Sequence, residues 1–212
     1  MFITFVIYLP AMQQCSYKTI AQASEGLCKE KGSKFFAFAY PIVNAAEVKP
    51  LVENLRKEHH AARHVCWAYK LGYTGNEYRA NDDGEPSNTA GKPILGQIDS
   101  FGLTNILVCV VRYFGGTLLG VGGLIQAYKE AAREALSVAE IIEKPIEYFV
   151  TLRFDYTMQV SVNQSLKQYK ARIVSQKFEI ACEFECAVPV LQKDLFLQSV
   201  SQLPDISIQP TE

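Results

Sequence analysis

The residues best suited to chemistry are one arginine and the glycines that follow it. Arg112 ends an apolar run, and five glycines occur in the nine residues 115–123. Glycine lets a backbone approach a ligand closely, because it has no Cβ and accepts positive φ. A helix that begins behind such a turn offers free N–H groups and the positive end of its dipole. Segment 112–123 therefore predicts an anion site.

Two familiar phosphate motifs do not fit this segment. A Walker A loop needs Lys and then Ser or Thr after its last glycine, whereas Val121 follows Gly120. The dinucleotide fingerprint fails because Ile125 stands where its third glycine belongs. The remaining alternatives are a tight turn without a ligand and a turn that approaches one. We favour the second, because a single turn does not require five glycines.

A second candidate site lies in the polar segment 82–93. Asp82, Asp83 and Glu85 place three carboxylates within four residues, and carboxylate oxygens are ligands that Mg²⁺ accepts. The spacing is not that of an EF-hand, so a solvated loop is the alternative, and composition favours it. The end of the segment, with Lys92, can instead offer N–H groups and a cation to an anion.

These candidates need a scaffold, and hydrophobic patterning predicts one over the first half of the chain. Residues 105–113 are apolar on both faces, which predicts a central strand. Helical periodicity predicts helices over 44–59 and 123–139, the first with a capping box of Asn44 and Glu47. Further expected elements are strands over 17–23, 34–40 and 63–71 and a long polar loop over 78–96.

The second half lacks glycine and predicts a compact βαββαβ order, which is the ferredoxin-like arrangement. Clean alternation over 180–188 predicts that Ile180, Cys182, Phe184, Cys186 and Val188 face the core. Pro145 and its predecessor resist helix, so we place the junction there, with domains at 1–143 and 144–212. The expected elements are strands 148–155, 172–177, 180–188 and 206–209 and helices 158–169 and 191–203.

Composition describes an ordinary globular chain. The net charge of −1 gives no overall field toward nucleic acid or membrane, so any anion site must be local. The apolar residues 2–9 are too few for a membrane span, which needs about 20, and are expected to form a strand or a start-site extension. A signal peptide begins with a positively charged region, but no Lys or Arg precedes Lys18. We therefore expect a cytoplasmic protein with reduced cysteines.

Four segments, in this order and spacing, resemble the Impact/YigZ family. The resemblance implies an α+β fold, with an N-terminal domain like those of ribosomal proteins and GHMP kinases. It likens the second domain to the last domain of elongation factor G. It also implies a link to translation and supplies no catalytic residues. Asn88 departs from the Gly, Ala or Ser usual in the family. The segments are residues 31–35 (KGSKF), 59–69 (HHAARHVCWAY), 82–95 (DDGEPSNTAGKPIL) and 112–123 (RYFGGTLLGVGG).

Three functional hypotheses follow, and a binding module is preferred. In it the first domain holds RNA or the ribosome, without a cofactor, membrane contact or DNA specificity, and a translation factor or other protein is a further partner. The alternatives are a Mg²⁺-dependent phosphoryl-transfer or hydrolytic enzyme that uses Asp82, Asp83 and Glu85, and a protein-only interaction module. The residues expected to bind RNA or another anion are Arg63, His64, Lys92, Arg112, Tyr113, Gly115 and Gly116.

Overall fold

The computed structural model describes residues 14–211, so the expectation for residues 2–9 lies outside the described part. The chain is a mixed α+β protein with two compact units. Residues 17–144 form the N-terminal unit, and residues 145–211 with 14–16 form the C-terminal unit. None of the helices between residues 14 and 211 combines the length and apolarity that a membrane crossing demands.

The N-terminal unit is built on a five-stranded antiparallel sheet in the order β2-β3-β6-β4-β5. Strand β6 is fully buried over Ile106–Arg112 and lies at the centre, as its apolar sequence predicts. The strands are β2 (Ser24–Glu30), β3 (Ser33–Pro41), β4 (His64–Leu71), β5 (Glu77–Asn81) and β6 (Ile106–Tyr113).

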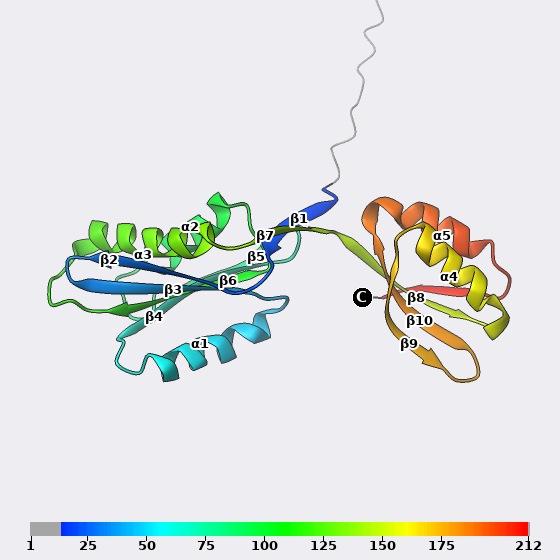
Figure 1. The fold of residues 1–212 in the computed structure, drawn as a ribbon, viewed down its shortest axis with the longest axis horizontal. Helices are drawn as coiled ribbons and strands as arrows, with labels where there is room; N and C mark the ends of the chain where they lie inside the picture. The colour runs from blue at the N-terminus through cyan, green and yellow to red at the C-terminus, as the bar shows by residue number, and fades with distance from the viewer. Residues whose placement is uncertain (1–13, 212) are drawn as a thin grey trace, which may run out of the picture. The chain divides into compact units, whose positions relative to one another are not determined.

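Helices cover both faces of this sheet (Figure 1). Helices α2 and α3 pack on one face, where Phe35, Val108 and Tyr128 belong to the core. Helix α1 packs on the other face, against Leu107 and Val111. The helices are α1 (Val48–Glu58), α2 (Gly91–Ser100) and α3 (Gly120–Ser137), and a 3₁₀ turn, η1 (Ala45–Glu47), precedes α1 with the expected capping box of Asn44 and Glu47.

Two expectations for the first half are wrong. The stretch 17–23 is not one strand, because β1 (Ser16–Ile20) ends early and pairs with β7 (Ile141–Pro145), while β2 starts at Ser24. The stretch 78–96 is not one long loop, because it holds most of β5 and the first turns of α2. Both errors arise where exposed polar residues hide the periodicity of an edge strand or a short helix.

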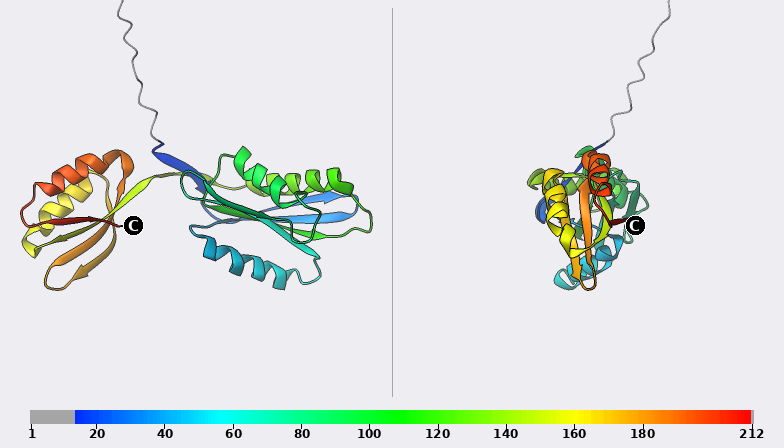
Figure 2. Two further views of the ribbon diagram at one scale, coloured as in Figure 1. Left: turned by 180° about the vertical axis from the view of Figure 1, so that it is seen from behind. Right: turned by 90° about the vertical axis from the view of Figure 1, so that its right-hand side faces the viewer.

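The C-terminal unit has a four-stranded antiparallel sheet in the order β11-β8-β10-β9, with two helices on one face, seen from behind in Figure 2. Cys182, Phe184, Cys186 and Val188 face its core as expected. Ile180 does not, because β10 begins two residues later and leaves its side chain 93% exposed. The elements are β8 (Glu147–Phe154), η2 (Tyr156–Met158), α4 (Gln159–Gln168), β9 (Arg172–Phe178), β10 (Cys182–Pro189), η3 (Val190–Gln192), α5 (Lys193–Ser201) and β11 (Ser207–Pro210).

Candidate anion-binding site

A pocket of about 390 Å³ lies where β6 ends and α3 begins, and we call it the arginine pocket. Three of the residues expected to bind an anion, Arg63, His64 and Arg112, meet in it although they come from two strands and a loop. Two guanidinium groups against the carboxylate of Glu85 leave the pocket positive. Its lining is Arg63, His64, Glu85, Pro86, Arg112, Phe114, Leu118, Leu119, Gly120, Val121 and Leu124.

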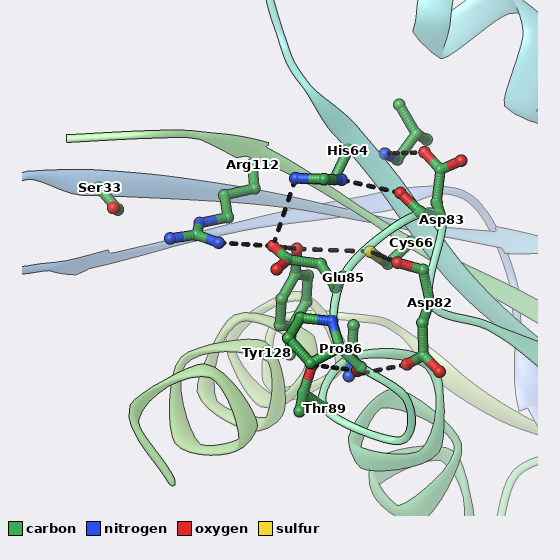
Figure 3. Close-up of polar contacts among 12 residues, drawn as sticks. Ser33, His64, Cys66, Asp82, Asp83, Glu85, Pro86, Thr89, Arg112 and Tyr128 are labelled. Carbon is green, nitrogen blue, oxygen red and sulfur yellow. Dashed lines mark hydrogen bonds and ion pairs between the residues drawn. The ribbon is translucent and has the colours of Figure 1, made fainter. Parts of the chain in front are cut away.

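Arg112 is not a free surface cation, because it forms a buried ion pair. Its Nη1 donates to Glu85 Oε1 at 2.6 Å, and the hydroxyl of Tyr128 donates to the same oxygen at 2.8 Å (Figure 3). Arg112 is only 6% exposed and Glu85 9%. A buried charge is tolerated when it is paired and hydrogen-bonded, so this pair holds the wall of the pocket together.

The pairing of Arg112 is incomplete, however. Its Nε is buried and has no hydrogen-bond partner. Its guanidinium carbon lies 5.7 Å from the ring centre of Phe114, and that of Arg63 lies 5.8 Å from the same ring. Arg63 itself is exposed. Phe114 is therefore flanked by two cations, one fixed in the wall and one exposed.

His64 is oriented by the backbone of the acidic segment. Its Nδ1 lies 2.8 Å from the carbonyl oxygen of Asp83, which can only accept, so Nδ1 carries the proton. Its Nε2 then faces Glu85 Oε1, 4.0 Å away (Figure 3). This second nitrogen is therefore the one directed at the Glu85–Arg112 pair.

Behind the pocket wall, Cys66 and Tyr128 extend the polar network into the core. The Cys66 sulfur lies 3.0 Å from the Asp82 carbonyl oxygen and 3.3 Å from the Tyr128 hydroxyl, and its single S–H can donate to either of them. Both side chains are 0% exposed, and burial raises the pKa of the thiol and of the phenol. Since the thiolate is the reactive form, Cys66 is a structural thiol.

The three carboxylates considered for Mg²⁺ do not converge on one point. Asp82 accepts from the backbone N–H groups of Ala90 and Gly91, at 3.0 and 2.8 Å, and so holds the start of α2. Asp83 accepts from Val65 N at 2.6 Å and pairs with Arg56, while Glu85 belongs to Arg112. Within residues 14–211 no group of three or more His, Cys, Asp or Glu side chains is arranged to hold a metal ion.

The departure at Asn88 has a local explanation. Its φ is +63°, a left-handed conformation that glycine adopts freely and that asparagine tolerates better than other residues. Its N–H donates to Asp82 Oδ2 at 2.8 Å. The segment 82–91 is therefore an ordered loop that closes on Asp82.

Gly115 has a packing role in the structure. A Cβ at this position would lie 1.9 Å from the carbonyl carbon of Gly32, and its N–H already donates to Ser33 Oγ at 3.1 Å. The turn between β2 and β3 thus lies directly against the segment that follows β6. This close backbone contact accounts for Gly115 and for the left-handed Gly32, whose φ is +82°.

Three other expected residues lie outside the arginine pocket. Lys92 is exposed on α2, and Gly116 forms no part of the lining. Tyr113 points to the opposite face of the sheet, where its hydroxyl lies 2.9 Å from His59 Nδ1. Consecutive strand residues point to opposite faces, so Arg112 and Tyr113 cannot share a pocket wall. The lining residues that were not expected to bind an anion include Phe114, Leu118 and Val121, whose exposed side chains only the fold reveals.

The first turn of α3 supplies the backbone part of the site. The cap residue Leu119 has no side-chain hydrogen bond to this turn, while Gly120 and Val121 line the pocket. The first N–H groups of α3 therefore have no side-chain acceptor from the cap residue, at a place where the helix borders the pocket. Gly122 is exposed, and a Cβ there would meet nothing within 4 Å, so packing does not demand a glycine.

Comparison with known proteins now decides the family. Residues 31–136, half of the chain, match the Impact N-terminal domain. The chain belongs to the IMPACT family. It is 30% identical over 188 residues to the IMPACT family member YvyE of Bacillus subtilis, which covers 89% of this chain and 87% of that protein.

One further relative agrees with this assignment, and one solved structure shares the fold of the chain. The chain is 32% identical over 181 residues to the IMPACT family member YigZ of Escherichia coli, covering 84% of this chain and 89% of that one. It also matches a crystal structure described as that of a hypothetical protein, with a TM-score of 0.75 and 28% identity, over 94% of this chain and 99% of that chain. The likeness to IMPACT family members therefore extends over both units.

Proposed function

We propose that this protein binds RNA, on its own or in the ribosome, and acts in the regulation of translation. The observation that carries the proposal is the Phe114 ring, which is 41% exposed and has the guanidinium carbons of Arg63 and Arg112 at 5.8 and 5.7 Å from its centre. An aromatic ring beside arginines suits a nucleotide, since the ring can stack a base and the cations can bind its phosphate. The IMPACT family is generally linked with translation regulation, which supports the same assignment.

The phosphate would lie between Arg63 and the first turn of α3. There it would meet an exposed guanidinium, backbone N–H groups and the positive end of the helix dipole. The unpartnered Nε of Arg112 adds a buried donor. The proposal gives the βαββαβ C-terminal unit a protein or ribosomal contact, in line with the resemblance of its sequence to the last domain of elongation factor G.

Arg63 is the residue to test, because Arg112 is tied to the fold through Glu85. We would measure binding of a labelled single-stranded RNA and of ribosomes at about 50 and 200 mM salt, with Arg63→Gln beside the wild type. The matched control is Arg133→Gln, which also removes a partly exposed arginine from this unit but leaves the pocket unchanged. Loss of one phosphate contact should weaken RNA binding by about tenfold and reduce the salt slope by about 0.7.

A protein partner is the second candidate, and one observation favours it. Leu118 and Val121, on the rim of the arginine pocket, are 84% and 59% exposed. Exposed apolar side chains beside a polar site are typical of protein contacts. Ribosome binding that is insensitive to salt and to Arg63→Gln, but lost in Leu118→Ser, would replace the RNA proposal with this one.

A further inference from the structure

A second pocket, of about 410 Å³, lies on the face of the sheet that α1 covers, and we call it the aromatic pocket. Helix α1 is the only helix of residues 17–144 on this face, and it leaves side chains of β3 half-buried beside it. The pocket is lined by Gly32, Lys34, Phe36, His59, Tyr113 and Phe114.

Three rings in this pocket hold one another in place. Phe36 stacks on His59 with ring centres 5.9 Å apart and 28° between the planes, and it meets the edge of Tyr113 at 5.8 Å. The 2.9 Å hydrogen bond between His59 and Tyr113 fixes the other two rings. All three side chains are half-buried, so each keeps an accessible surface. The rings form a preorganised surface for a further planar group.

Phe114 lines both pockets, so the aromatic pocket adjoins the arginine pocket. The two pockets adjoin at the end of β6, because Arg112 points to one face of the sheet and Tyr113 to the other. Phe114 follows both residues at the point where the strand ends. Lys34, exposed on the neighbouring strand, adds a cation on the aromatic side.

We infer that the two pockets form one track for single-stranded RNA. In this track the aromatic pocket stacks the base adjacent to the nucleotide whose phosphate lies in the arginine pocket. The inference rests on the proposed function and names the class of RNA. A base must be unpaired to stack on protein rings, and such stacking tolerates any base. The cations of Lys34, Arg63 and Arg112 on both sides of Phe114 suit the backbone between two such nucleotides.

The test compares two variants of β3 that differ in whether they touch the track. Phe36→Leu removes a pocket ring while keeping an apolar side chain. Phe38→Leu is the matched control, because Phe38 is also half-buried and lies 5.5 Å from the same His59 ring but does not line the pocket. Thermal unfolding of both variants shows whether their folds remain intact and comparable.

Fluorescence anisotropy would measure binding of a labelled oligouridylate of about eight nucleotides and of a blunt RNA duplex, with uridine monophosphate as a competitor. We expect Phe36→Leu to bind the oligouridylate about tenfold more weakly, with the affinities for duplex and monophosphate unchanged. Phe38→Leu should bind all three probes as the wild type does.

Any other result of these binding measurements overturns either the RNA track or the proposed function. If Phe36→Leu and Phe38→Leu bind the oligouridylate equally while Arg63→Gln loses it, the track is wrong and the arginine pocket stands. Equal wild-type affinity for duplex and single strand also removes the track. If the wild type binds neither RNA, the proposed function fails together with the inference.

Discussion

At the scale of single residues, the arginine pocket depends on an ion pair whose hydrogen bonding is incomplete. Glu85 Oε1 receives hydrogen bonds from both Arg112 and Tyr128, whereas Arg112 Nε receives no acceptor. A buried donor without a partner costs free energy, on the order of 1–3 kcal/mol. An anion that reached Arg112 would recover part of that cost. Arg112 therefore has a structural role through Glu85, and its buried Nε is a donor that this pairing leaves unsatisfied.

We expect the Glu85–Arg112 pair to respond strongly to loss of either partner. Glu85→Gln leaves the buried guanidinium without its counter-charge and should lower the free energy of unfolding by about 3 kcal/mol. Urea unfolding can be followed through the fluorescence of Trp67, the only tryptophan of the chain, which lies in the N-terminal unit.

A double-mutant cycle separates pairing from general damage at this site. Arg112→Gln alone should also destabilise, because Glu85 then stays buried without its cation. The double variant Glu85→Gln/Arg112→Gln buries no charge and should lose clearly less than the sum of the two single losses. Additive losses would show that the two side chains do not stabilise each other.

Sequence reasoning identified the arginine but not its partner, and the reason is physical. Arg112 and Glu85 are 27 positions apart, and only the ordered loop that closes on Asp82 brings them together. Arg63 and His64 could be proposed from charge and position alone. Lys92 and Tyr113 show the limit of that approach, because the face on which a residue lies depends on where each element begins.

At the scale of elements, the glycines between β6 and α3 perform different tasks. Gly115 meets the backbone of Gly32 and Ser33, whereas Gly122 meets no atom of another element. Gly116 and Gly120 adopt positive φ of +87° and +71°. One sequence motif therefore combines a packing contact, two left-handed turns and an exposed helix start.

This division leads us to expect opposite effects of alanine at two of these positions. Gly115→Ala should destabilise the N-terminal unit by more than about 2 kcal/mol, since its Cβ would clash with the backbone of Gly32. Gly122→Ala should stabilise it by about 0.5–1 kcal/mol, because alanine is the better helix former and its methyl group meets open space.

Urea unfolding of the two variants, followed through Trp67, measures both changes. RNA binding of Gly122→Ala adds a functional reading, because a ligand that approaches the first turn of α3 would meet the new methyl group. A stabilised variant with weakened RNA binding supports close backbone approach. A destabilised Gly122→Ala would mean that this turn is constrained by something other than packing.

Elements with local signals were predictable, and elements with distant ones were not. The capping box of Asn44 and Glu47 lies within four residues and was identified from the sequence. Helix α2 was missed because the carboxylate that holds its start belongs to Asp82, nine positions before Gly91. Strand β5 was missed because it is an edge strand of five residues, and its apolar residues Tyr78 and Ala80 are exposed like their polar neighbours. The partner of each element, Asp82 for the start of α2 and strand β4 for β5, lies outside a short sequence window.

At the scale of the whole molecule, each unit encloses its own core, and each core contains buried thiols. Cys66 and Cys109 lie in the N-terminal unit and Cys182 and Cys186 in the C-terminal unit, all 0% exposed. The change in glycine content between the halves indicated two parts. Burial raises the pKa of these thiols, to about 12 for Cys186. Tyr128 follows the same rule, because its phenol is also buried.

These raised pKa values imply that the protein loses stability in alkaline solution. An unfolded thiol ionises near pH 8.5 and an unfolded phenol near pH 10, about the values of free side chains, whereas the buried groups stay protonated. Above those values the unfolded chain binds fewer protons than the folded one, so the free energy of unfolding falls as the pH rises. Each buried group lowers the free energy of unfolding by at most about 1.4 kcal/mol for every pH unit above the pKa that it has in the unfolded chain. Below about pH 8 the stability that these groups contribute is fully present.

Urea unfolding at pH 7, 9 and 10, followed through Trp67, would measure this decline for the N-terminal unit. Cys109→Ala is the informative variant, because Cys109 is fully buried and its thiol contacts no pocket. The variant should start less stable at pH 7, since it leaves a small cavity, yet lose less stability between pH 7 and 10 than the wild type. Parallel declines in the two proteins would mean that the Cys109 thiol ionises in the folded state, and that the core around β6 admits water.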